Sequence, residues 1–373
     1  MHTIDLSKVK EATRTRSERP ALRGFDFVEF YVGNTLQAAY FYRTAFGFTP
    51  IAQAGLETGL RDRTSIVLGQ QDIRFVLTGA LRPDHPISAS VGLHGDSVKD
   101  VAFAVDDAES VFEHAVSRGA RPVTEPEVLE DDHGRVVRAA IAGHGDLVHT
   151  LIEREDYAGA FLPEFQPIAA AAPLAPSLFR TVDHIAFSVE RGTLDEWAAF
   201  YQHCLGFDEV YQESTTTEYS SMRSKVVQNG EIRFTLLEPA DGRRKSQIEE
   251  YLQYHGSSGA QHVALLADDI VQAVRHLKAS GVDFLNAPGA YYDMLPERIG
   301  AIEEDVTRLR ELGILLDRDE WGYLLQIFSK PVQSRPTLFL EIIQRKEARG
   351  FGSGNIRALF QAVEMEQTRR GNL

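Results

Sequence analysis

The sequence is poor in cysteine and has no long apolar run. Cys204 is the single cysteine, so an internal disulfide and a zinc-thiolate site are both excluded. The lack of disulfides suits a reducing compartment. No apolar stretch reaches the eighteen residues that a membrane-spanning helix needs, and residues 1–20 lack the apolar core of a signal peptide. The sequence therefore predicts a soluble, cytoplasmic protein that does not bind a membrane.

Basic residues are also in deficit, with 39 Lys and Arg against 54 Asp and Glu and a net charge of −15. No basic cluster offers a surface for phosphates, so a nucleic-acid partner is not expected. Phosphate-loop, dinucleotide-binding and serine-nucleophile motifs are missing as well. The length of 373 residues and the 43% of hydrophobic residues favour two ordinary domains with buried cores.

What the chain does contain is an internal repeat. Four segments share a strand, a polar turn and an amphipathic helix, at 25–48, 99–120, 182–207 and 261–282. Alternating runs at 64–78 and 223–239 predict hairpins after the first segment of each half. Each half is thus predicted to be a doubled strand-helix-strands unit.

The predicted domain organisation follows from this repeat. Residues 1–20 are expected to be a disordered segment, and 21–157 form the first domain. Residues 158–179 are rich in proline and alanine without a period, which is typical of a linker. Residues 180–373 form the second domain, and the end of the chain is predicted to be a closing helix that lies against this domain.

Three positions differ between the aligned halves in a chemically specific way. His184, His262 and Glu341 align with Phe27, Asp100 and Thr150 respectively. Two imidazoles and one carboxylate on three strands are the ligand set that holds non-haem Fe(II) and leaves positions open for substrate and dioxygen. We therefore predict an Fe(II) site in the second domain only.

Structural roles are the alternative at each of these positions. A single histidine at a strand start is commonly a hydrogen-bonded structural residue, and a glutamate in a strand commonly points to solvent. Glu341, however, interrupts an apolar run, where an unpaired carboxylate is costly to bury. His94 and His255, each followed by glycine at similar places in the halves, are interpreted as structural turn residues.

At these residues the chain resembles the vicinal-oxygen-chelate superfamily, and within it the 4-hydroxyphenylpyruvate dioxygenase and 4-hydroxymandelate synthase family. The similarity covers nearly the whole chain and includes "VDH" at 182–184, "QHVAL" at 261–265, "RPTLFLEIIQR" at 335–345 and "GFGSGN" at 350–355. It implies an α+β fold of two vicinal-oxygen-chelate domains, each a pair of βαβββ units forming an open barrel. It also implies Fe(II), a 2-oxo acid substrate, O2, and a homodimer or homotetramer.

The resemblance implies two possible products from 4-hydroxyphenylpyruvate. The synthase hydroxylates the benzylic carbon and gives 4-hydroxymandelate, a precursor in antibiotic biosynthesis, whereas the dioxygenase gives homogentisate. The dioxygenases carry Pro-Ile-Asn-Glu-Pro where this chain has Thr235 to Pro239, so that an amide is replaced by Leu237. They also carry phenylalanine at the position of Ile356. We therefore predict the synthase, with the dioxygenase as the alternative.

Further substrate contacts are implied by the same family motifs. They are Ser224, Thr235, Leu237, Gln247, Gln326, Phe328, Phe351, Asn355 and Ile356. For Phe328 and Phe351 the alternative is ordinary core packing.

Two other function classes remain open at this point. One is a metal-free binding module of the same superfamily, which should lack the three ligands. The other is a glyoxalase-type isomerase or an extradiol ring-cleaving enzyme, which the closing helix and "LLQIF" at 324–328 disfavour.

Overall fold

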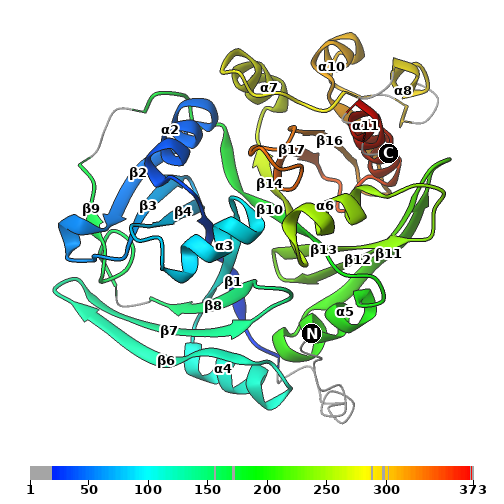
Figure 1. Ribbon diagram of the computed structural model, residues 1–373. Helices are drawn as coiled ribbons and strands as arrows, with labels where there is room; N and C mark the ends of the chain where they lie inside the picture. The colour runs from blue at the N-terminus through cyan, green and yellow to red at the C-terminus, as the bar shows by residue number, and fades with distance from the viewer. Residues whose placement is uncertain are drawn as a thin grey trace.

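The fold consists of two curled sheets that lie side by side, one from each half of the chain (Figure 1). The computed structural model describes residues 19–154, 157–169, 173–286, 289–295, 299–300, 302–369 and 371. The first sheet has the strand order β6-β7-β8-β5-β1-β4-β3-β2-β9 and the second β11-β12-β13-β10-β14-β17-β16-β15. The predicted α+β class is confirmed.

The first half contains the two expected βαβββ units. The first unit comprises β1 (Leu22–Tyr31), α2 (Thr35–Phe46), β2 (Thr49–Ala54), η2 (Leu56–Thr58), β3 (Arg63–Gln70) and β4 (Ile73–Ala80). The second comprises β5 (Ser97–Val105), α4 (Ala108–Ser117), β6 (Pro122–Asp131), β7 (Gly134–Ala142) and β8 (Val148–Glu153), and α3 (Pro86–His94) joins the two.

The second half repeats this order. Its first unit comprises β10 (Phe179–Ser188), α5 (Leu194–Leu205), β11 (Asp208–Thr216), β12 (Ser221–Asn229) and β13 (Ile232–Ala240), followed by α6 (Gln247–His255). Its second comprises β14 (Gly259–Ala267), α7 (Ile270–Ala279), α8 (Gly289–Asp293), α10 (Val306–Leu312), β15 (Leu315–Arg318), β16 (Tyr323–Phe328) and β17 (Phe339–Lys346). The predicted closing helix is α11 (Ser353–Arg369), which lies beside the second sheet (Figure 1).

The repeated strand-to-helix turns have a local cause in the sequence. Asp107 and Asp269 each precede a helix, and their carboxylates accept hydrogen bonds from the backbone N–H groups of Ser110 and Gln272, at 2.8 and 2.9 Å. An aspartate at this position satisfies a donor that the first helical turn leaves free. The same residue therefore starts α4 and α7 at equivalent places in the two halves.

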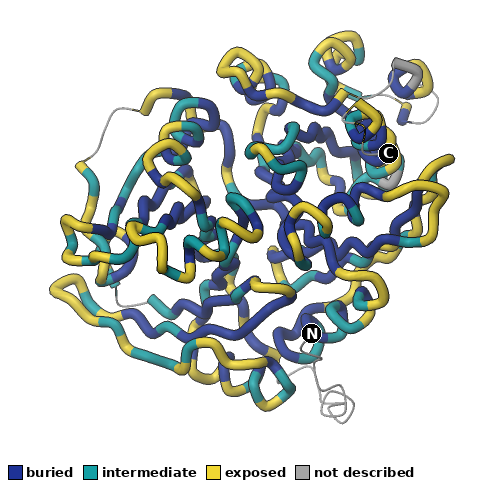
Figure 2. Tube along the Cα trace, viewed as in Figure 1, coloured by how far each residue is buried: buried dark blue, intermediate teal, exposed yellow. Residues whose placement is uncertain are grey.

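The two halves share one hydrophobic core. The rings of Phe25 and Phe103 in the first half lie 6.0 Å from the ring of Phe234 in the second. In Figure 2 the central strands of both sheets are mostly buried, whereas the outer helices carry exposed segments. Separation of the halves would expose these rings, so we expect the two sheets to unfold together.

The segment between the halves also contacts the first sheet. β9 (Gln166–Pro167) pairs with β2, and Phe161 and Leu162 are buried against Phe27. The predicted division into domains at residues 157 and 179 stays a proposal, and residues 1–18 of the predicted N-terminal segment lie outside the described residues. No helix among the described residues has the length and apolar character needed to cross a membrane.

Candidate metal centre

Strand register brings the three predicted ligands to one face of the second sheet. His184 on β10 lies opposite Ala264 on β14, and Ala264 lies beside Glu341 on β17. His262 lies opposite Ala186, two residues along β10 from His184. Because directly paired residues on neighbouring strands point to the same face, all three side chains project from one face of the sheet.

The ligand atoms of these residues form a compact, buried group. His184 Nε2 lies 3.2 Å and His262 Nε2 3.3 Å from Glu341 Oε2, and the three ligand atoms lie within 4.8 Å of one another. All three side chains are buried. The structure thus brings together the residues that sequence comparison of the halves selects.

A backbone bulge precedes each histidine and orients its ring. Asp183 and Gln261 fall at register shifts between β10 and β14, so each adds one residue to its strand. Asp183 Oδ1 lies 2.8 Å from His184 Nδ1, and Gln261 Oε1 lies 3.1 Å from His262 Nδ1. A hydrogen bond at Nδ1 leaves Nε2 as the metal-binding nitrogen.

Asp183 is itself held by a partly buried arginine. Arg345 donates from Nε and Nη2 to the two carboxylate oxygens of Asp183, at 2.7 and 2.8 Å, and from Nη1 to the carbonyl of Gly350 at 2.7 Å. Its guanidinium also lies 5.5 Å from the ring of Phe351. Arg345 therefore connects the first histidine ligand to the loop before α11.

The three side chains of this group shift one another's pKa values. Burial alone would raise the pKa of Glu341, but the charges and hydrogen bonds of His184 and His262 outweigh burial and lower that pKa. Burial opposes the charged form of His184, yet Glu341 and Asp183 raise its pKa to about 9. Burial lowers the pKa of His262 despite Glu341. The neighbouring side chains thus favour the charged form of Glu341 and the protonated form of His184.

The residues present fit a divalent transition-metal ion. Glu341 Oε1 is buried and forms no hydrogen bond with any described residue. A carboxylate oxygen without a partner in a dry interior is costly, and a cation at this place would satisfy it. Two imidazole nitrogens and one carboxylate oxygen are also the donors of the facial triad with open positions.

The first half lacks these ligands at the corresponding places. Register aligns Phe27, Asp100 and Thr150 with the three ligands, as the sequence comparison predicts. Arg154 nevertheless donates to both carboxylate oxygens of Asp26, in the positions of Arg345 and Asp183. The first half therefore keeps the supporting ion pair without the ligands that the pair supports in the second half.

The predicted substrate contacts come from several elements of the second half. Thr235 and Leu237 on β13 are paired with Ala186 and Ser188, and Ser224 on β12 is paired with Leu237, so all three share the ligand face. On β16, Phe328 lies opposite Glu341, and the buried Gln326 has its Oε1 unpartnered among the described residues. Gln247, the first residue of α6, lines a small cavity with Gln261 and Phe339.

The closing helix supplies the remaining predicted contacts. The ring of Phe351 lies 5.1 Å from the ring of His184. Asn355 is fully buried and accepts a hydrogen bond from the Tyr291 hydroxyl at 2.5 Å through its Oδ1. Ile356 packs against the cluster that contains Leu237 and Phe360. The roles of all these side chains as substrate contacts stay a prediction.

Four residues that support the site were not predicted from the sequence. They are Asp183, Gln261, Tyr291 and Arg345. A polar residue directly before each histidine is visible in "VDH" and "QHV". In a regular strand such neighbours point to opposite faces, so only the bulges make them partners.

The chain is similar to known proteins along nearly its whole length. Residues 18–162 match the model of the hydroxyphenylpyruvate dioxygenase N-terminal family, and residues 181–327 match that of the glyoxalase/bleomycin resistance protein/dioxygenase superfamily. The chain is 46% identical to a 4-hydroxyphenylpyruvate dioxygenase of Yarrowia lipolytica, over 94% of each protein. It is 44% identical to one of Xenopus tropicalis, over 94% of this chain and 92% of that protein.

A solved structure is similar along the same length. It is a triple mutant of the 4-hydroxymandelate synthase of Streptomyces coelicolor, with a TM-score of 0.85 and 41% identity. The match covers 94% of this chain and 99% of that one.

Proposed function

This chain belongs to the 4-hydroxyphenylpyruvate dioxygenase and 4-hydroxymandelate synthase family, and we propose on that premise that it converts 4-hydroxyphenylpyruvate and O2 to homogentisate and CO2. The buried group of His184, His262 and Glu341 is the observation that carries the proposal. The full-length relatives named 4-hydroxyphenylpyruvate dioxygenase favour this product. The residues Leu237 and Ile356 predict the synthase, but the full-length relatives favour the dioxygenase instead.

Fe(II) is the proposed metal. When bound by two imidazoles and one carboxylate, iron supplies open positions for a chelating 2-oxo acid and for O2. His184, His262 and Glu341 would hold the ion, and Asp183 and Gln261 would keep the two rings in the orientation that presents Nε2.

Other residues of the chain would bind and orient the substrate. Phe328 and Phe351 lie beside the histidine rings and would contact the aromatic ring of the substrate. Gln326 and Asn355 are buried amides with unpartnered atoms among the described residues, and they would hydrogen-bond the polar ends. The burial of the site excludes water from the reacting carbon.

Benzylic hydroxylation to 4-hydroxymandelate is the second candidate. Leu237 and Ile356 lie in one apolar cluster, at the two positions where the family resemblance distinguishes the synthases. The similarity to the Streptomyces synthase supports this candidate too. Small differences in substrate position decide which carbon is oxidised, so these residues bear directly on the product.

An aerobic assay with chromatographic product analysis tests both candidates. The iron-loaded protein is expected to consume one O2 per 4-hydroxyphenylpyruvate and to release homogentisate. 4-Hydroxymandelate as the main product would establish the second candidate, and no O2 uptake by protein with one bound iron would reject both. Glu341→Ala should lose iron and turnover together, whereas the matched variant Thr150→Ala in the first half should keep them.

A further inference from the structure

The first half contains a cavity at the place that corresponds to the metal centre. Its volume is about 420 Å³, and Phe27, Asp100 and Thr150, the counterparts of the three ligands, all line it. This volume lies in the range of small-molecule sites, roughly 300 to 1,000 Å³. The half without metal ligands has therefore kept a binding-sized space.

Two carboxyl groups lie side by side in the wall of this cavity. Glu29 on β1 is paired with Asp100 on β5, so their side chains lie on the same face of the sheet. Glu29 accepts a hydrogen bond from the Thr78 hydroxyl, and Asp100 accepts from the backbone N–H and the hydroxyl of Thr150. Two carboxylates directly opposite each other repel unless a proton or a cationic group lies between them.

The protonation of these carboxyls reflects their surroundings. Burial raises the pKa of Glu29, and burial with the nearby Glu29 charge raises the pKa of Asp100 to about 7, although hydrogen bonds from Thr150 oppose the shift. An ammonium group bound between the two carboxyls would remove this cost.

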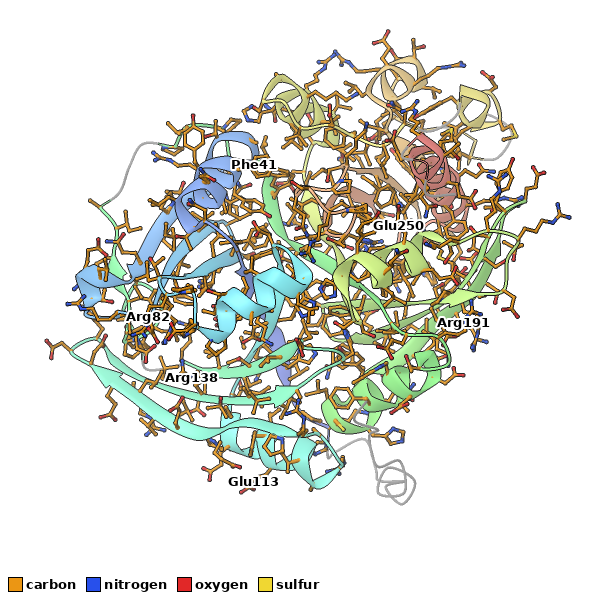
Figure 3. All side chains as sticks on the ribbon, in the orientation of Figure 1. Phe41, Arg82, Glu113, Arg138, Arg191 and Glu250 are labelled. Atoms are coloured by element: carbon orange, nitrogen blue, oxygen red, sulfur yellow. The ribbon has the colours of Figure 1, made fainter. Side chains whose placement is uncertain are left out.

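The cavity also contains cationic side chains, whose charges oppose the effect of burial on the pKa of Glu29. Arg63, Lys99 and Arg138 line the cavity, and Figure 3 labels Arg138, which comes from β7. Arg138 also pairs with Glu127, with an Nη2 to Oε1 distance of 2.6 Å. The cavity thus offers both signs of charge, which suits a ligand that carries an ammonium and a carboxylate close together.

The remainder of the wall is apolar and aromatic. The ring of Phe161 lies 5.4 Å from the ring of Phe27 and 4.8 Å from the ring of Phe165, and Val76 and Leu162 complete this side. Aromatic rings at such edge-on distances form favourable contacts with a further ring.

Two polar residues of this cavity, Glu29 and Thr78, have apolar counterparts in the second half. Strand register aligns Glu29 with Ala186 and Thr78 with Leu237. The hydrogen-bonded pair of Glu29 and Thr78 is therefore particular to the first half.

We propose that the cavity of the first half-barrel binds an α-amino acid with an aromatic side chain. The ammonium group lies between Glu29 and Asp100, and the carboxylate faces Arg63, Lys99 and Arg138. The aromatic side chain lies among Phe27, Phe161 and Phe165.

Calorimetric titration of the full-length, iron-loaded protein with L-phenylalanine tests the proposal. Binding of one equivalent is expected. Phenethylamine, which lacks the carboxylate, and 3-phenylpropionate, which lacks the ammonium, should each bind at least about tenfold more weakly. Absence of binding, or equal binding of either analogue, would overturn the proposal.

Variants locate the site. The double variant Glu29→Gln with Asp100→Asn should weaken binding of L-phenylalanine by at least about tenfold, whereas Glu130→Gln on the exposed face of β6 should not change it. Glu341→Ala should also leave binding unchanged, which separates this cavity from the metal centre. A crystal structure with L-phenylalanine beside His184 instead of Asp100 would contradict the assignment.

Discussion

At the scale of single residues, Asp183 is a positioning residue for the metal centre. It accepts a hydrogen bond from His184 and is held by Arg345. Asp183→Asn removes the charge that stabilises both neighbours, so we expect iron to bind about 10- to 100-fold more weakly. Competition with a chelator measures this affinity.

A matched control for this variant exists inside the chain. Asp26→Asn disturbs the equivalent ion pair with Arg154 in the first half and should leave iron affinity unchanged. Equal iron affinity of Asp183→Asn and the unmodified protein would show that Asp183 does not orient the ligand.

Asp100 is predicted to make stability depend on pH in the opposite sense to a typical salt-bridged aspartate. Its pKa is raised to about 7 by burial, so the folded state holds a proton that the unfolded state releases above its ordinary pKa of about 4. Stability is then lost as the pH rises through this window. Asp100→Asn removes this titration. Its effect on the free energy of unfolding should therefore be more stabilising at pH 8 than at pH 5, by roughly 1–3 kcal/mol.

Urea unfolding at the two pH values measures this difference. Glu130→Gln on the exposed strand β6 should show the same pH dependence as the unmodified protein. A constant difference between Asp100→Asn and the unmodified protein would mean that Asp100 is ionised in the folded state.

The metal ligands could be predicted from the sequence because each position of the second half can be compared with the aligned position of the first half. Glu341 stands out only when the aligned residue is Thr150, and strand register confirms that alignment. The partners of the histidines could not be predicted, because Asp183 and Gln261 reach the rings through bulges. A bulge depends on both paired strands, and alternation along one strand does not reveal it.

At the scale of elements, Tyr291 fixes the closing helix. Its hydroxyl accepts from the backbone N–H of Leu316 at 2.8 Å and lies 2.5 Å from Asn355 Oδ1 on α11. Tyr291→Phe removes the hydroxyl that hydrogen-bonds Leu316 and Asn355, which should lower the free energy of unfolding by about 1–3 kcal/mol. Hydrogen exchange in α11 and the melting temperature should both report the loss.

A Tyr→Phe change elsewhere in the core is the control for this prediction. Tyr251 on α6 is buried and its hydroxyl donates to the carbonyl of Ala260 at 3.0 Å, so Tyr251→Phe should leave exchange in α11 unchanged. Equal protection of α11 in Tyr291→Phe would show that the helix is held by other contacts.

The helices between α7 and β15 were the least predictable elements. α8 and α10 are five and seven residues long, and helices of this length are marginal without tertiary contacts. Tyr291 and Leu309 are buried, and these contacts stabilise the helices. The longer strands and helices follow from their periodic sequence, which is a local property.

At the scale of the whole molecule, histidines gather where the halves meet. His94 and His255 end α3 and α6, and their rings stack at 4.3 Å, so these predicted turn residues also join the halves. His149 in the first half hydrogen-bonds the Tyr201 hydroxyl of the second at 3.0 Å. Neither ring nitrogen of the buried His144 hydrogen-bonds a described residue.

These buried imidazoles predict loss of stability in mild acid. Burial lowers the pKa of His144 to about 3 and those of His149 and His255 to about 4, below their unfolded value of about 6.5. Their neutral forms stabilise the fold above pH 6.5, and this stability is lost as the pH falls toward the folded pKa values. At pH 5 each contributes a loss of up to about 2 kcal/mol.

Melting temperatures between pH 7 and pH 5 check this prediction. His144→Phe keeps an apolar ring beside Phe187 and Trp197 and should reduce the acid-dependent drop. His133→Phe, an exposed change on the turn between β6 and β7, should not reduce it. An unchanged drop in His144→Phe would place the acid sensitivity outside the interface.

The ion pair between Asp26 and Arg154 has a consequence for protein design. A metal site requires ligands and also a rigid support that aims them, and the support is the harder part to build. In the first half this supporting ion pair is present, and the strand register matches that of the second half. Exchanging Phe27, Asp100 and Thr150 for His, His and Glu would place a second ligand set on a backbone of equivalent register. One chain would then carry two candidate metal sites.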